Sequence, residues 1–214
     1  MTRVLLLCGV VGPALFIVTF LVDGATRPGY DPWRNFVSSL ATGDRGWIQI
    51  ANFLVWSVLS LALSIGLVRR RIGGPGAVIA LYAASIALAG IFVTDPSLGY
   101  PPGAPPERTT HGQLHGVAAL AAFLLNAIAA AATAAHFMSD PRWLAFARYS
   151  VFTGLAVLAL FLGSAVLPVL DARGAWPNAP AGLVQRLSIV VGLTWFSALA
   201  FRLWRDGASP APER

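Results

Sequence analysis

Two histidines and an aspartate are spaced so that they could do chemistry together. Asp95 ends an apolar run in the stretch GIFVTDP, and His111 and His115 open the next run in TTHGQLHG. Residues four apart lie on one face of a helix, so the two imidazoles would point the same way. The connecting loop brings the chain back beside Asp95. We therefore expect the three side chains to meet, where they could hold a proton or a metal ion.

One chemistry open to this group is proton transfer to a lipophilic substrate. A carboxyl group beside lipid is desolvated, which raises its pKa, so Asp95 would keep a proton at neutral pH. His111 or His115 would hydrogen-bond to it and orient it. Such an acid could protonate an alkene or epoxide of an isoprenoid, starting a cyclisation or isomerisation. Aromatic rings deep in the apolar runs would stabilise the developing positive charge, namely Trp56, Tyr82 and Trp195.

Two other interpretations use the same residues. Two imidazoles and a carboxylate are also the ligands of a catalytic zinc site with one open position, so Asp95, His111 and His115 could bind Zn²⁺. Zinc-bound water would then hydrolyse a lipid ester or amide. In the third interpretation the protein is a non-catalytic partner subunit or small-solute carrier. Arg186, in GLVQRLS, would then pair with Asp95 in a buried ion network, or extend its guanidinium outward to water.

The composition requires a membrane to position these residues. Of 214 residues, 57% are hydrophobic and 11% are charged, and the mean hydropathy is +0.70. A soluble domain carries about 25% charged residues, so this composition excludes a soluble globule, a disordered chain and a nucleic-acid module. A spanning helix needs about 20 apolar residues. Six runs qualify: 4–22, 47–68, 76–94, 112–136, 145–169 and 184–204.

We therefore expect an all-α, polytopic six-transmembrane-helix bundle that forms a single domain over residues 1–214. Its partners would be the lipid bilayer and a lipophilic small molecule. All 15 basic residues are arginines. With the N-terminus in the cytoplasm, nine arginines and three acids lie inside, and six arginines and six acids lie outside. Because cytoplasmic segments carry the excess of basic residues, both termini are predicted to be cytoplasmic.

The first outer loop, residues 23–46, predicts a short amphipathic helix. Asp31 followed by Pro32 is typical of an N-cap and the first helical position. Apolar side chains then recur at helical spacing until Gly43, at Trp33, Phe36, Val37 and Leu40. Such a helix would cover the bundle or form a lid over a cavity. As a lid, it would bring Tyr30, Asp31 and Trp33 to the substrate.

A polar stripe runs along the fourth apolar run. Asn126 lies eleven positions and Thr133 eighteen positions after His115. At 100° per residue, both return to within about 20° of the His115 direction. Such a stripe must face the interior of the bundle, because lipid cannot satisfy polar groups. We expect Asn126, together with Asn52 of the second run, to contact a bound substrate.

Five short motifs occur in a characteristic order: PGYDP and SSL in the first outer loop, GIFVTDP, TTHGQLH and GLVQR. In this order the chain resembles the bacterial membrane family called domain of unknown function 998, over nearly its whole length. The resemblance implies six spans or a similar number and a bacterial inner membrane, and it implies that the outer motifs meet in space. It implies no activity.

Overall fold

The computed structural model describes residues 1–105 and 107–206, and this part of the chain contains six long α-helices. They are α1 (Thr2–Ala25), α2 (Gly46–Arg69), α3 (Gly73–Ile91), α4 (Thr110–Phe137), α5 (Leu144–Ala172) and α6 (Ala181–Asp206). All six are long and apolar enough to cross a membrane. The prediction of an all-α fold with six spanning helices is therefore confirmed, although α3 ends three residues before the predicted boundary at residue 94.

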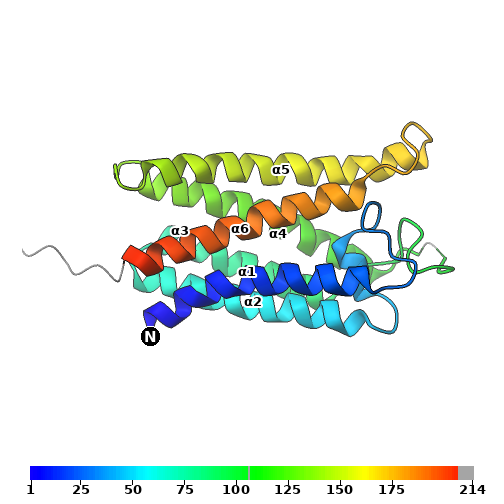
Figure 1. Ribbon diagram of the computed structural model, residues 1–214, viewed down its shortest axis with the longest axis horizontal. Coiled ribbons are helices and arrows are strands. Elements are labelled where there is room, and N and C mark those ends of the chain that lie inside the picture. The colour runs from blue at the N-terminus through cyan, green and yellow to red at the C-terminus, as the bar shows by residue number, and fades with distance from the viewer. Residues whose placement is uncertain (106, 207–214) are drawn as a thin grey trace, which may run out of the picture.

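The helices form a closed ring. Each packs against its neighbours in the sequence, and α1 also packs against α6, whereas α4 and α6 hardly touch each other. Figure 1 shows the N-terminus and the end of α6 at the same end of the bundle. The longer connections, between α1 and α2, α3 and α4, and α5 and α6, lie together at the opposite end, which we call the loop end.

Small residues and apolar surfaces explain this packing. A Cβ atom at Gly12 of α1 would lie 2.6 Å from the Trp56 ring of α2, so only glycine lets these two helices approach so closely. The outer surface of the ring carries large exposed apolar side chains, for example Val58, Val117 and Phe152. A soluble protein rarely exposes so much apolar surface, and a lipid environment accounts for it.

The amphipathic α-helix expected from Asp31 is not present, and this prediction is wrong. The segment forms turns, followed by a five-residue 3₁₀-helix, η1 (Val37–Ala41). Most of η1 is buried, and it lies at the loop end of the bundle. The reason is competition for backbone groups. Arg186 donates hydrogen bonds to the carbonyls of Pro32 and Asn35, and the Gln185 side chain accepts from the Val37 N–H. These side chains of α6 engage the groups that a continuous helix would use.

Candidate functional site

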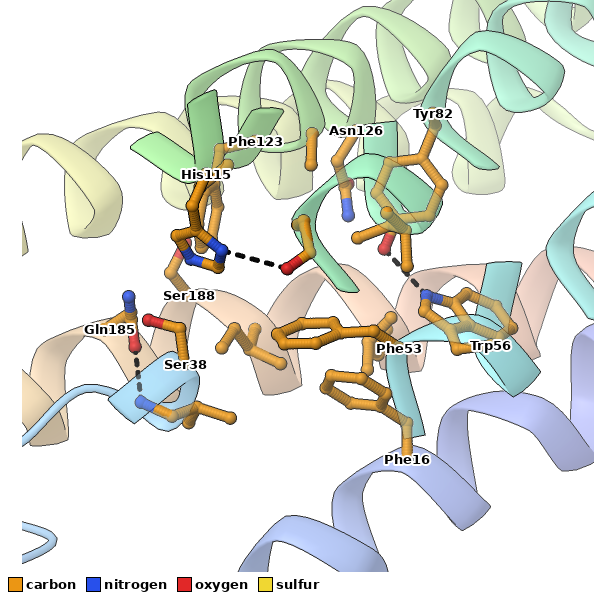
Figure 2. A pocket seen from close by; sticks show the side chains of 17 residues that line it. Phe16, Ser38, Phe53, Trp56, Tyr82, His115, Phe123, Asn126, Gln185 and Ser188 are labelled. Carbon is orange, nitrogen blue, oxygen red and sulfur yellow. Dashed lines mark hydrogen bonds between the residues drawn. The ribbon is translucent and has the colours of Figure 1, made fainter. Parts of the chain in front are cut away.

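A pocket lies inside the ring of helices, on the side of the loop end, and we call it the axial pocket (Figure 2). Its volume is about 70 Å³. Side chains of η1 and of every helix except α5 line it: Phe16, Val37, Ser38, Phe53, Trp56, Tyr82, Ile86, Ala89, His115, Ala119, Ala122, Phe123, Asn126, Gln185, Ser188, Ile189 and Leu193. The wall is mostly apolar and aromatic, which is the common character of a small-molecule site.

His115 contributes an imidazole to this wall. Its Nδ1 lies 2.9 Å from the Ala89 carbonyl oxygen and 2.8 Å from the Phe92 carbonyl oxygen, at the end of α3. Carbonyl oxygens only accept hydrogen bonds, so Nδ1 carries the hydrogen and Nε2 of the neutral ring carries a lone pair. His115 therefore joins α4 to α3 and offers the pocket a hydrogen-bond acceptor.

Tyr82 and Trp56 form the aromatic side of the inner end of the pocket. The Trp56 Nε1–H donates to the Tyr82 hydroxyl oxygen at 2.8 Å, and the rings meet edge to face. Both side chains are almost completely buried. Trp195 is different. It is fully buried but lies outside the pocket, where its Nε1–H donates to Ser150 Oγ of α5 at 2.9 Å.

Asn126 reaches the pocket from α4, and it is only 5% exposed. Its Oδ1 atom is buried without a hydrogen-bond partner in the described part of the chain. The amide lies against Gly192 of α6, where an added Cβ would come within 2.4 Å of Nδ2. The polar stripe is therefore internal at His115, Asn126 and Thr133, whereas His111 is exposed.

Asp95 does not fit the role of a proton donor. It lies in the loop after α3, where it accepts hydrogen bonds from Thr109 N at 3.0 Å and from Thr109 Oγ1 at 2.6 Å. The Thr109 side chain first and its backbone N–H second hold the pKa of Asp95 below the ordinary value of 3.8. The carboxylate is ionised and sits at the N-terminus of α4, which it stabilises. The sequence prediction of a raised pKa is wrong because donors, not lipid, surround this carboxyl group.

The zinc interpretation fails for a related reason. Among residues 1–105 and 107–206, no three His, Cys, Asp or Glu side chains lie where they could hold a metal ion. His115 uses Nδ1 on two carbonyls, and His111 packs its ring edge to face against Phe92, with ring centroids 5.5 Å apart. The three side chains that the sequence brings together thus have separate partners.

Arg186 does not pair with Asp95, which corrects the expected ion network. The guanidinium is buried and donates to the carbonyls of Pro32 and Asn35 at 2.6 and 2.8 Å. It also donates to the Tyr30 hydroxyl and lies over the Tyr30 ring. Burial raises the pKa of Tyr30 to about 12. Arg186 is therefore an anchor for the first loop, with neutral acceptors as its partners.

The other predicted contact residues lie outside the axial pocket. Asp31 Oδ1 accepts from Trp33 N at 2.9 Å within the first loop, and Trp33 Nε1–H donates to the Asn178 carbonyl at 3.0 Å. Asn52 joins α2 to α1 by donating to the Phe16 carbonyl at 3.1 Å, and it also donates to Gln49 Oε1. These residues bind one part of the protein to another, and Tyr30 does the same through Arg186.

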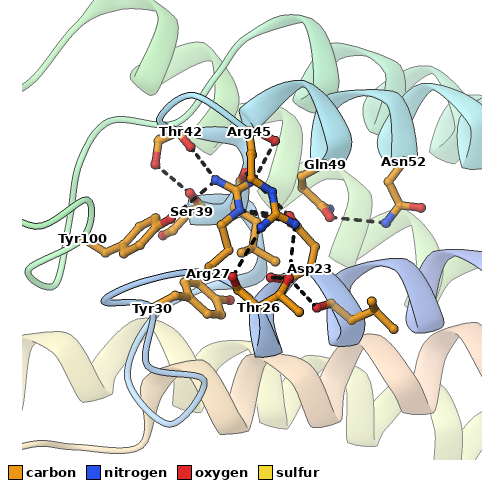
Figure 3. Close-up of polar contacts among 12 residues, drawn as sticks. Asp23, Thr26, Arg27, Tyr30, Ser39, Thr42, Arg45, Gln49, Asn52 and Tyr100 are labelled. Atoms are coloured by element: carbon orange, nitrogen blue, oxygen red, sulfur yellow. Dashed lines mark hydrogen bonds and ion pairs between the residues drawn. The ribbon is translucent and has the colours of Figure 1, made fainter.

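An ion cluster at the loop end, in which Asp23 and Arg27 are buried and Arg45 is partly exposed, was not singled out from the sequence (Figure 3). Arg27 and Arg45 both pair with Asp23, each at 2.9 Å, and Arg27 also donates to the carbonyls of Leu40 and Thr42. Arg27 thereby fixes the end of η1 to α1, as Arg186 fixes the preceding turn to α6. The signal available in the sequence was the i, i+4 spacing of Asp23 and Arg27 at the end of an apolar run.

Four sequence-predicted residues thus meet at the axial pocket: Trp56, Tyr82, His115 and Asn126. Sequence reasoning missed Ser38, Gln185 and Ser188, although Gln185 and Ser188 are polar residues of an apolar run. A comparison with family models matches residues 10–202 to the family described as "Protein of unknown function (DUF998)". No curated protein and no solved structure matches the chain.

Proposed function

The chain belongs to the DUF998 family of proteins of unknown function, and from the axial pocket we propose that it binds a slender lipophilic molecule within the membrane. One observation carries the proposal: six separate elements of the chain leave a mainly apolar space of about 70 Å³ between them. Interiors of proteins are otherwise close-packed, so a space of this size in the core is a feature to be explained. The inner end of an apolar chain, a few carbon atoms long, would fill it, with the rest of the molecule extending outward beside η1.

The exposure of the lining residues indicates how such a molecule enters. Trp56, Tyr82 and Leu193, at the inner end, are almost completely buried. The half-buried lining residues come from η1, α4 and α6: Ser38, Ala119, Phe123, Gln185 and Ile189. Because these half-buried residues surround η1, we infer that the pocket opens at the loop end, beside η1. A bound chain would extend from there into the bundle.

We propose that the protein binds a lipophilic molecule, and we do not propose that it is an acid-initiated cyclase. Protonation of an isoprenoid would require a neutral acid at the pocket, and the lining residues include no carboxyl group. Asp95 is ionised, and His115 offers a lone pair. The non-catalytic interpretation, a carrier or partner subunit, is compatible with what lines the pocket. We retain the prediction from the arginine bias that the loop end faces the outside of the cell.

The test is photolabelling of the protein in lipid nanodiscs with a decanol that carries a diazirine, followed by mapping of adducts by mass spectrometry. We expect adducts on pocket residues such as Phe123 and Ile189, displaced by excess decanol. Ala119→Trp places an indole in the pocket and should reduce this labelling about tenfold or more. Ala131→Trp is the matched control, because Ala131 lies on the same helix but is exposed on its surface.

Two results would overturn the proposal. The first is labelling of the pocket residues that excess decanol does not displace, which would indicate nonspecific contact with the probe. The second is equal labelling in the Ala119→Trp protein, provided that its melting temperature equals that of the Ala131→Trp protein.

A further inference from the structure

The inner end of the axial pocket contains two hydrogen-bonding groups that complement each other. Asn126 Oδ1 is a buried acceptor without a partner in the described part of the chain. The Tyr82 hydroxyl oxygen accepts from Trp56 Nε1–H, so its own hydrogen is left without an acceptor among the described residues. A free donor and a free acceptor therefore line the same apolar space.

The packing of α3 against α4 places these two groups at one level of the bundle. His115 contacts the carbonyl of Ala89, and the two helices run antiparallel. Seven residues before Ala89 is Tyr82, and seven residues after His115 is Ala122. Because both helices rise about 1.5 Å per residue, Tyr82 is level with the turn of α4 that runs from Ala122 to Asn126. Figure 2 shows Tyr82 and Asn126 at the same end of the pocket.

We propose that the space between Tyr82 and Asn126 is a subsite for the hydroxyl group of the lipophilic ligand. The ligand would then be a lipid alcohol. This inference rests on the proposed function. A hydroxyl group accepts one hydrogen bond and donates another. It would accept from the Tyr82 hydroxyl and donate to Asn126 Oδ1. A hydrocarbon leaves these groups unpaired, and an ether, which only accepts hydrogen bonds, leaves Asn126 Oδ1 unpaired.

The surroundings favour a ligand hydroxyl over a trapped water molecule. A buried water molecule is usually held by about three hydrogen bonds. The Trp56 N–H is already used on Tyr82, and the neighbouring wall at this depth is apolar, including Leu193, Ala122 and Phe53. A water molecule would use the polar groups of Tyr82 and Asn126 but leave this apolar wall uncovered, whereas a hydroxyl on an apolar chain also packs its carbon atoms against the wall.

The experiment compares two competitors of equal chain length, decanol and decyl methyl ether, against photolabelling by the diazirine-bearing decanol. We expect decanol to displace the probe from the pocket residues at about tenfold lower concentration than the ether, since loss of one hydrogen bond in a dry site costs about this factor. In the Asn126→Leu protein the two competitors should become equal, and Tyr82→Phe should reduce the difference. Thr133→Val is the matched control, because Thr133 also has an unpaired, buried oxygen on α4 but lies outside the pocket.

The outcomes separate the two proposals. Equal displacement by decanol and the ether in the native protein would overturn the hydroxyl subsite and leave the lipophilic pocket intact. The same conclusion follows if Thr133→Val and Asn126→Leu change the selectivity to the same extent. Absence of displaceable labelling of the pocket residues would instead overturn the proposed function itself. Melting temperatures of all variants identify any that fail to fold.

Discussion

Asn126→Leu should stabilise the ligand-free protein, which is an unusual expectation for a buried residue. The amide is 5% exposed, and its Oδ1 has no partner within the described residues. A buried polar group that lacks a hydrogen bond costs about 1–3 kcal/mol. Leucine has a similar branched shape and carries no polar atom, so it removes this cost. For a chain of this length we expect Tm to rise by about 2–12 °C.

Asn52→Leu is the matched control and should have the opposite effect. Asn52 has nearly the same burial, but its amide donates to the Phe16 carbonyl and to Gln49 Oε1. Removal of hydrogen bonds between helices in a membrane costs about 0.6–1.7 kcal/mol. The same substitution at two buried asparagines therefore changes stability with opposite signs, which excludes a general effect of added hydrophobicity.

The assay is thermal unfolding of both variants in detergent after extensive washing to remove bound lipid. A fall in Tm for Asn126→Leu would refute the reasoning, because it would mean that Asn126 is hydrogen-bonded in the ligand-free protein. Addition of decanol should then stabilise the native protein more than the Asn126→Leu protein. An equal shift in both would contradict the hydroxyl subsite.

Three further predictions concern the loop end. Arg27→Met should lower the free energy of unfolding, measured by thermal or denaturant unfolding, by about 3 kcal/mol. This is the low end of the range for breaking a buried ion pair, because Arg45 still pairs with Asp23. Asp95→Asn should lower Tm at pH 7. Because folding lowers the pKa of Asp95, the wild-type advantage should be complete above the unfolded value of about 3.9 and should be lost as the pH falls from there through the lower pKa of the folded protein. Gly182→Ala should lower Tm, because its Cβ would lie 2.3 Å from a backbone oxygen of the first loop, whereas Gly163→Ala meets only an ordinary contact at 3.5 Å and should not.

Each of these has a result that would contradict it. An Arg27→Met protein as stable as the native one would mean that the cluster in Figure 3 does not hold η1 in place. For Asp95, a Tm difference that persists unchanged down to pH 3 would show that the carboxylate is not the stabilising form. For the glycines, equal tolerance of alanine at both positions would mean that the first loop does not lie against the start of α6.

The chemistry of the candidate site was only partly accessible from the sequence. The helical period placed His115 and Asn126 on one inner face of α4, and the depth of Trp56 and Tyr82 in their runs placed them in the core. These are arguments about single helices, and they hold because one helix fixes the direction of its own side chains. Which side chain pairs with which depends on the packing between helices, and there the expectations for Asp95 and Arg186 were wrong.

Asp95 illustrates the reason. Its position at the end of an apolar run suggested lipid as its surroundings, but the next helix begins beside it, and Thr109 supplies two donors. Arg186 was expected to pair with Asp95 or to extend outward to water, but the first loop supplies carbonyl oxygens and the Tyr30 hydroxyl. Backbone groups carry no residue identity, so a sequence pattern does not reveal when they are the partners.

The sequence by itself determined that the helices lie in a lipid membrane, how many of them are long enough to span it, and which face of α4 points inward. These features could be predicted because hydrophobic runs and helical periodicity are local properties of the chain. Only the tertiary structure decided that Arg27 and Arg186 hold the first loop, which folds into η1, and that Asp95 binds Thr109, the N-cap residue of α4. It also decided that Tyr82 and Asn126 line one pocket, which neither α3 nor α4 defines alone. These outcomes depend on competition for hydrogen bonds among segments far apart in the chain, which is settled when the helices pack.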